Sequence, residues 1–177
     1  MAASGVRAAA ALTTAALALA PIHAAADPQK VGNWTFEVVS DPITDQQTGR
    51  AWVDAPEGRV FIKCDKPGSG TVYAAIAPDR PLGYEGPELK YPDVVWRADK
   101  GEPVDQQWKF FNDVGFTQSR QDAQRFMDAI AMSEHLAIRV FDYEGQPVDM
   151  AFDTNGAAEA EAKVISVCSE ETASGLK

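Results

Sequence analysis

Short runs in which apolar and polar residues alternate, each ended by a turn signal, constrain this fold more than any other feature of the sequence. Trp34, Phe36 and Val38 alternate with their neighbours, and so do Leu136, Ile138 and Val140. Such a period of two is typical of half-buried strands. Turn-forming residues separate the runs, as in Pro56-Glu57-Gly58. We therefore expect strands at residues 34–39, 50–54, 59–64, 71–77, 94–98, 107–112, 136–140 and 148–152, with an irregular loop over residues 78–92.

Two helices are predicted in the C-terminal half. Ser119 is typical of an N-cap, with Asp122 three residues further on. The apolar stripe that follows is Ala123, Phe126, Met127, Ile130 and Ala131. A cap at Thr154 or Asn155 would begin a last helix, whose shared face is Ala157, Ala160, Val164, Val167 and Cys168. Strand runs with helices placed late predict an α+β fold, an antiparallel sheet of about 6–8 short strands with both helices packed on it.

Residues 1–26 have the features of a cleavable secretory signal. Arg7 precedes an apolar run over residues 8–20, and Ala24-Ala25-Ala26 supplies a small-residue cleavage site. A bilayer span takes about 20 apolar residues, so a retained anchor is the less favoured alternative. We expect cleavage after Ala26, a periplasmic or secreted protein with no stable membrane anchor after cleavage, and one domain over residues 27–177 with a frayed tail at residues 169–177.

Cys64 and Cys168 are the only two cysteines. Disulfides persist in exported proteins, so we expect one structural bridge between them. A catalytic thiol and half of a metal site are the alternatives. A C-x-x-C motif, which a thiol–disulfide enzyme would use, is absent.

The charge balance disfavours two classes of partner. Twenty-six acidic residues against 16 basic ones give a net charge of −10. Such a chain is a poor electrostatic match for nucleic acid or for anionic lipid. Because export is predicted, we expect the partners to be envelope proteins, whose identity the sequence does not give.

The search for catalytic motifs finds mostly absences. There is no H-E-x-x-H, Walker A, G-x-G-x-x-G or G-x-S-x-G motif. Ser133 and His135 stand two residues apart at the end of a predicted helix, so their side chains are not expected to face each other. His135 suits the helix C-terminus instead. We expect no enzyme, no catalytic residues and no cofactor.

Carboxylates and tryptophans supply two weaker candidate sites. A calcium ion takes six to eight oxygen ligands, and residues with side-chain oxygens cluster around a predicted hairpin: Asp142, Glu144, Asp149, Asp153 and Asn155. EF-hand spacing fails there, so a solvated acidic rim is the alternative. The tryptophans Trp34, Trp52, Trp96 and Trp108 could form a sugar-stacking platform. Each lies in an alternating run, which favours packing in the core or on a sheet face.

The ordered motifs of the chain resemble a known family. They are Gly32-Asn33-Trp34, residues 40–45 (Ser-Asp-Pro-Ile-Thr-Asp), Phe61-Ile62-Lys63-Cys64, residues 95–99 (Val-Trp-Arg-Ala-Asp), Trp108, the helix at residues 126–130, residues 136–140 (Leu-Ala-Ile-Arg-Val), residues 152–156 (Phe-Asp-Thr-Asn-Gly) and Val167-Cys168. In this order and spacing they resemble the VasI family of exported proteins associated with type VI secretion, and related uncharacterised bacterial envelope proteins. The resemblance implies a small periplasmic accessory protein with one disulfide and brings no catalytic residues. The invasion-associated locus B proteins are similar in size and compartment, with fewer matching residues.

Three functions follow as expectations. The first is a non-enzymatic periplasmic accessory or interaction protein, which predicts an exposed apolar patch or an unprotected edge strand. The second is a small-ligand or calcium-binding module, which predicts a concave pocket. The third is a hydrolase that uses carboxylates or Ser133, which requires two such groups within hydrogen-bond reach.

Overall fold

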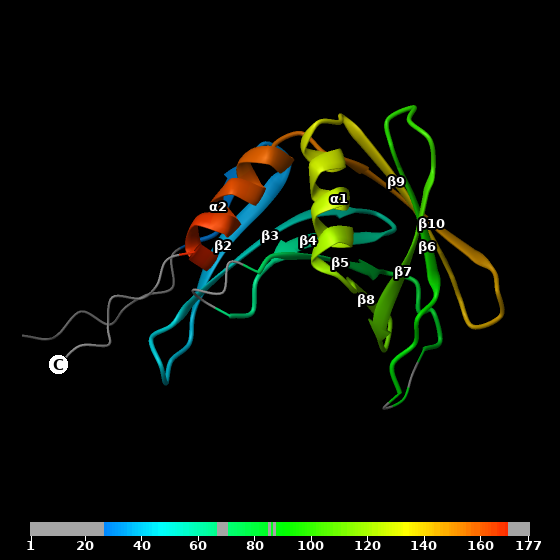
Figure 1. Cartoon of the computed structure of the whole chain (residues 1–177), viewed down its shortest axis with the longest axis horizontal. Helices are drawn as coiled ribbons and strands as arrows, with labels where there is room; N and C mark the ends of the chain where they lie inside the picture. The colour runs from blue at the N-terminus through cyan, green and yellow to red at the C-terminus, as the bar shows by residue number, and fades with distance from the viewer. Residues whose placement is uncertain (1–26, 67–70, 85, 87, 170–177) are drawn as a thin grey trace, which may run out of the picture.

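The computed structural model describes residues 27–66, 71–84, 86 and 88–169 (Figure 1). The predicted signal at residues 1–26 lies outside the described residues, as do residues 170–177 of the predicted tail. Ser169, the first residue of that tail, is instead the last residue of the final helix. Within the described ranges, no helix has the length and apolar character needed to cross a membrane.

In the part of the chain that the structure describes, ten strands form one sheet in which all neighbours are antiparallel. The spatial order is β1-β2-β3-β4-β5-β8-β7-β6-β9-β10. The elements are β1 (Gln29–Val31), β2 (Trp34–Ser40), β3 (Gln47–Ala55), β4 (Gly58–Lys63), β5 (Tyr73–Pro78), β6 (Asp93–Ala98), β7 (Val104–Phe111), β8 (Val114–Thr117), α1 (Arg120–Ala131), β9 (His135–Phe141), β10 (Pro147–Asp153) and α2 (Ala157–Ser169).

The antiparallel sheet, the two helices and the single disulfide of the predicted α+β fold are confirmed, but the expected 6–8 strands were too few. All eight expected strands are present, and β1 and β8 are additional. Three residues of β1 are too few to display a period. β8 begins two residues after β7, across the turn Asn112-Asp113, in which Asn112 has a φ of 50°. The expected strand at residues 107–112 corresponds to β7 alone, and the four residues of β8, which include Gly115, were not predicted as a strand.

Helix α1 begins as its sequence predicts. The Ser119 hydroxyl oxygen accepts the backbone N–H of Asp122 at 3.0 Å, which satisfies one of the donors left free at a helix start. The buried residues of α1 are Ala123, Phe126, Met127 and Ile130, four of the five residues in the expected stripe. In α2 the buried face is Ala157, Ala160, Glu161, Val164 and Cys168.

Both helices lie on the same face of a strongly bent sheet (Figure 1). Helix α2 packs on β1–β4, whereas α1 packs on β5, β8 and α2. The bend also brings the last strand of the sheet, β10, into contact with β3. The core between helices and sheet is centred on large, fully buried side chains, among them Trp34, Trp108, Phe110 and Phe126.

One buried amide organises this core beneath α1. The Gln106 side-chain oxygen accepts the indole N–H of Trp96 at 2.9 Å and that of Trp108 at 3.0 Å. Both indoles meet the Phe126 ring edge to face, with ring centroids 5.3 Å apart in each pair. A single glutamine therefore satisfies two buried donors that would otherwise destabilise the fold.

The sheet consists of three locally paired units: β1–β5, β6–β8 and β9–β10. Within the described residues, two pairings join these units, β5 with β8 and β6 with β9. The β5–β8 pairing comprises two residue pairs, Ala75 with Phe116 and Ile76 with Gly115. Helix α1, which packs on both strands, covers this join.

Candidate functional site

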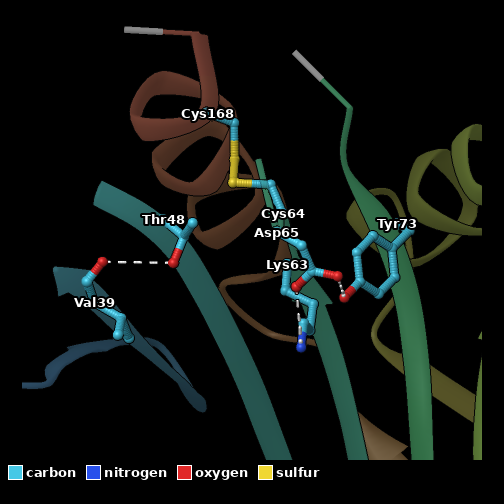
Figure 2. The surroundings of a disulfide bond; sticks show 7 residues. All are labelled: Val39, Thr48, Lys63, Cys64, Asp65, Tyr73 and Cys168. Carbon is cyan, nitrogen blue, oxygen red and sulfur yellow. Dashed lines mark hydrogen bonds and ion pairs between the residues drawn. A yellow bond between two sulfur atoms is a disulfide. The ribbon is translucent and has the colours of Figure 1, made fainter. Parts of the chain in front are cut away.

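The disulfide joins the end of β4 to the last turn of α2 (Figure 2). Cys64 and Cys168 are bonded, with their Cα atoms 6.2 Å apart, and both are buried. The Cys64 backbone N–H donates to the Gly49 carbonyl at 3.1 Å. The predicted bridge is confirmed, and its position between a strand and a helix is that of a structural crosslink.

Ser133 and His135 line a polar hollow of about 620 Å³ between the end of α1 and the start of α2. The Ser133 hydroxyl lies 3.3 Å from the Thr154 hydroxyl and donates to the Ile130 carbonyl at 3.4 Å. The Thr154 hydroxyl in turn donates to the Ser133 carbonyl at 2.5 Å. No hydrogen bond joins Ser133 to His135, so the pair lacks the contact that a nucleophile needs with its base.

The candidate calcium ligands are spread along β10 and the residues on either side of it. Asp142 and Glu144 precede the strand, Asp149 is its third residue, Asp153 is its last residue and Asn155 follows it. At about 3.4 Å per residue, β10 holds the first two and the last two of these residues roughly 20 Å apart. Among the residues that the structure describes, no three His, Cys, Asp or Glu side chains are grouped as a metal site.

Each of these acidic groups also has a local partner. Asp142, which is buried, accepts the backbone N–H groups of Glu144 and Gln146 at 3.0 and 2.8 Å and pairs with Arg80 at 2.8 Å. Asp149 accepts two hydrogen bonds from Arg139, at 2.6 and 2.7 Å. Hydrogen bonding to Arg139 lowers the pKa of Asp149.

Glu144 and Asp153 also have local hydrogen-bond partners. Glu144 accepts the Tyr143 hydroxyl at 2.8 Å, and Asp153 accepts the Asn155 backbone N–H at 2.9 Å. In each of these two contacts a carboxylate accepts a hydrogen bond from a residue one or two positions away in the sequence.

The tryptophans do not form a common platform. Trp34, Trp96 and Trp108 are buried in the core. Trp52 lies on the outer face of the sheet, flanked by the guanidinium carbons of Arg50 and Arg59 at 5.6 and 5.7 Å from its ring centroid. All four tryptophans therefore pack in the core or on a sheet face, which is the favoured interpretation of their alternating runs.

Sequence reasoning missed a groove of about 590 Å³ where β5 begins, β8 ends and α1 starts. Its apolar wall is Val72, Tyr73, Leu89, Phe111, Phe116 and Ala123. The remaining lining residues are Asp65, Thr71, Lys109, Thr117, Gln118, Ser119 and Arg120. We call this the strand-end groove. The one available signal was the pair of phenylalanines, Phe111 and Phe116, on either side of the Asn112-Asp113 turn.

A second feature is the tip of the β2–β3 hairpin, residues 41–46, which projects from the body of the molecule (Figure 1). The Asp41 carboxylate accepts the backbone N–H groups of Ile43 and Thr44 at 2.8 and 2.9 Å. These hydrogen bonds lower the pKa of Asp41. Further backbone bonds link Asp41 to Gln46 at 2.8 Å and to Asp45 at 3.0 Å. The tip is thus an ordered turn, and the Ile43 side chain on it is 89% exposed.

Comparison with known proteins shows the fold alone. No family model matches the sequence, and no curated protein matches it. Among solved structures, the chain is similar to invasion associated protein B from Bartonella henselae, known from a crystal structure. The TM-score is 0.54 with 13% sequence identity, over 82% of this chain and 100% of the other. At that identity the chain shares an architecture with an invasion-associated protein, and the likeness carries no residue roles.

Proposed function

We propose that this protein is an exported, non-enzymatic accessory protein that binds other envelope proteins through the tip of its β2–β3 hairpin. The observation that carries the proposal is Ile43, the most exposed large hydrophobic side chain in the described residues, at 89%. A solvent-exposed isoleucine on a turn fixed by hydrogen bonds is pre-organised for contact, which reduces the entropy lost on binding.

The charges around the tip define the partner's chemistry. Asp41 and Asp45 flank Ile43, and the lowered pKa of Asp41 keeps its carboxylate ionised over most of the pH range. A fitting partner surface has an apolar socket for Ile43 and basic residues around it. The resemblance to the VasI family makes components of a type VI secretion apparatus the first partners to examine.

Strand addition at the sheet edges is the less favoured mode of binding. The edge strand β1 has three residues, and β10 exposes Pro147, Asp149 and Asp153. Short edges, proline and charge are devices that discourage strand addition. The exposed Ile43 side chain is therefore better supported as the contact with a partner than either edge strand of the sheet.

The experiment is site-specific photocrosslinking in the native envelope, with the photoreactive residue in place of Ile43. The control places it at Met132, which is 83% exposed at the end of α1. We expect one envelope protein to be recovered from the Ile43 position and not from the Met132 position. Mass spectrometry identifies it.

A second arm tests whether that contact contributes to binding. Ile43→Asp should abolish co-purification of the same partner, whereas Met132→Asp should retain it, with unchanged thermal unfolding of both variants. Equal recovery from both positions, or no partner at either, would overturn the proposal.

A further inference from the structure

The strand-end groove has the size and lining of a small-molecule site. Its volume of about 590 Å³ lies within the range of known ligand pockets, which are mostly apolar with a few polar groups. Phe111 and Leu89 on its wall are 51% and 39% exposed. The Tyr73 and Phe116 rings form another part of the wall, with their centroids 6.0 Å apart.

Three separate segments hold this wall in place. Backbone hydrogen bonds between Lys90 and Phe110, at 3.1 and 2.8 Å, fix Leu89 beside the end of β7. Phe116 of β8 lies opposite both Ala75 of β5 and Lys109 of β7 in the register. The groove is therefore formed by the ends of β5, β7 and β8 together with the segment at Leu89, which backbone hydrogen bonds hold against β7.

Most polar groups in the groove are already engaged. Asp65 accepts the Tyr73 hydroxyl at 2.5 Å and pairs with Lys63 at 3.4 Å, as Figure 2 shows. The Thr117 hydroxyl bonds with the backbone of Ala74, and that of Ser119 caps α1. Thr71 and Arg120 also have partners.

Among the described lining residues, Lys109 and Gln118 are the two whose polar side-chain atoms have no hydrogen bond or ion pair. Lys109 is exposed and lies on β7 across from Phe116, so its side chain is on the same side of the sheet as the aromatic wall. Lys109 is therefore a positive charge beside the apolar wall that no acidic side chain of the described residues neutralises. A ligand that fits both features has an apolar body and one anionic group.

We propose that the strand-end groove binds a small amphipathic anion, with its apolar body against Phe111, Phe116 and Leu89 and its acidic group paired with Lys109. The carboxylate, sulfonate or phosphate of such a molecule accepts a charge-assisted hydrogen bond from the ammonium group. This site is separate from the hairpin tip, and the two proposals stand or fall independently.

Two fluorescent probes that differ in charge test this inference directly. Anilinonaphthalene sulfonate carries an anionic group, and N-phenylnaphthylamine has the same aromatic body without it. In titrations of the whole protein we expect saturable binding of both, with the anionic probe tighter at low salt. Added salt should reduce the difference in affinity between the two probes, because it screens an exposed ion pair.

Substitutions separate the two parts of the site. Lys109→Met should weaken the anionic probe about fivefold, the strength of an exposed ion pair, and leave the neutral probe unchanged. Phe111→Ala should weaken both probes. The controls are Lys100→Met, an exposed lysine in the β6–β7 turn, and Ile43→Ser at the hairpin tip, and neither should change either affinity.

Two results would overturn the inference. Equal effects of Lys109→Met and Lys100→Met on the anionic probe would exclude recognition by Lys109. Probe binding that Phe111→Ala leaves unchanged would place the probes elsewhere on the surface.

Discussion

Two glycines, Gly32 and Gly156, bring the β1–β2 turn against the start of α2. Their φ values are 59° and 94°, and the Asn33 backbone N–H donates to the Asn155 carbonyl across the contact at 2.9 Å. A Cβ atom on Gly156 would lie 2.1 Å from the Val31 carbonyl oxygen, which is far inside van der Waals contact. The backbones can approach this closely only because neither residue has a side chain.

Gly156→Ala should therefore lower the free energy of unfolding by about 3 kcal/mol or more. Gly145→Ala is the matched control, because Gly145 also has a positive φ, 78°, but has open space around it. Gly145→Ala should lower the free energy of unfolding only by the cost of placing alanine at a positive φ, about 1–2 kcal/mol. Urea unfolding measures both, and equal losses would mean that the close approach contributes nothing.

Glu161 is a buried acid without a hydrogen bond, on the face of α2 that meets α1. Burial raises its pKa, and the nearby Asp128 carboxylate raises it further. The folded protein thus binds the Glu161 proton more tightly than the unfolded chain does. Stability is highest while Glu161 is protonated and falls as pH rises through its folded-state pKa.

Glu161→Gln should accordingly raise the melting temperature near neutral pH and have little effect in acid, below the ordinary pKa of glutamate. The comparison is Glu159→Gln, which changes an exposed residue of the same helix, with 69% of its side chain accessible. Thermal unfolding as a function of pH follows both variants. A stabilisation of Glu161→Gln that persists unchanged in acid would contradict the titration argument.

At the scale of elements, the sequence predicts whatever is encoded in neighbouring residues. The period of two in β2, β4 and β9 and the Ser119 cap of α1 are local signals, and the structure has these elements where they were expected. β1 and β8 were missed for equally local reasons. One is three residues long, and the other follows a two-residue turn and contains Gly115, which weakens a strand pattern.

The disulfide links two elements that meet only in the folded state, β4 and α2. It closes a loop with a sequence separation of 104 residues, and in the chain-entropy model such a bridge stabilises by about 4–5 kcal/mol. Cys64→Ser, Cys168→Ser and the double variant should all lose a similar amount. Reduction of the unmodified protein should reproduce that loss.

Chemical denaturation in the absence of reductant measures these free energies. If the losses of the single variants add in the double variant, the bond is not their common cause.

At the scale of the whole molecule, the candidate sites could not be predicted from the sequence. The five candidate calcium ligands, four acids and one asparagine, lie within 14 positions of one another, from Asp142 to Asn155, yet the extended β10 separates the first two from the last two. The strand-end groove shows the converse, because Asp65, Leu89 and Phe116 are distant in sequence and adjacent in space. Its existence depends on β8 lying beside β5, and strand order is not a property of any local pattern.

The short β5–β8 pairing has a consequence for how the molecule opens. With two residue pairs joining them, the β1–β5 unit and the units beyond it should separate in local unfolding before either unit loses its own pairings. Successive N–H groups of a strand point to opposite neighbours, so amide hydrogen exchange would then be faster at whichever of Gly115 and Phe116 donates toward β5 than at Val60 and Ile62, which lie in the centre of β4. Equal protection at the two places would show a sheet that opens as one unit. Because Tyr73 and Phe116 stand on opposite sides of this pairing, an occupant of the strand-end groove would bridge both units and slow their separation.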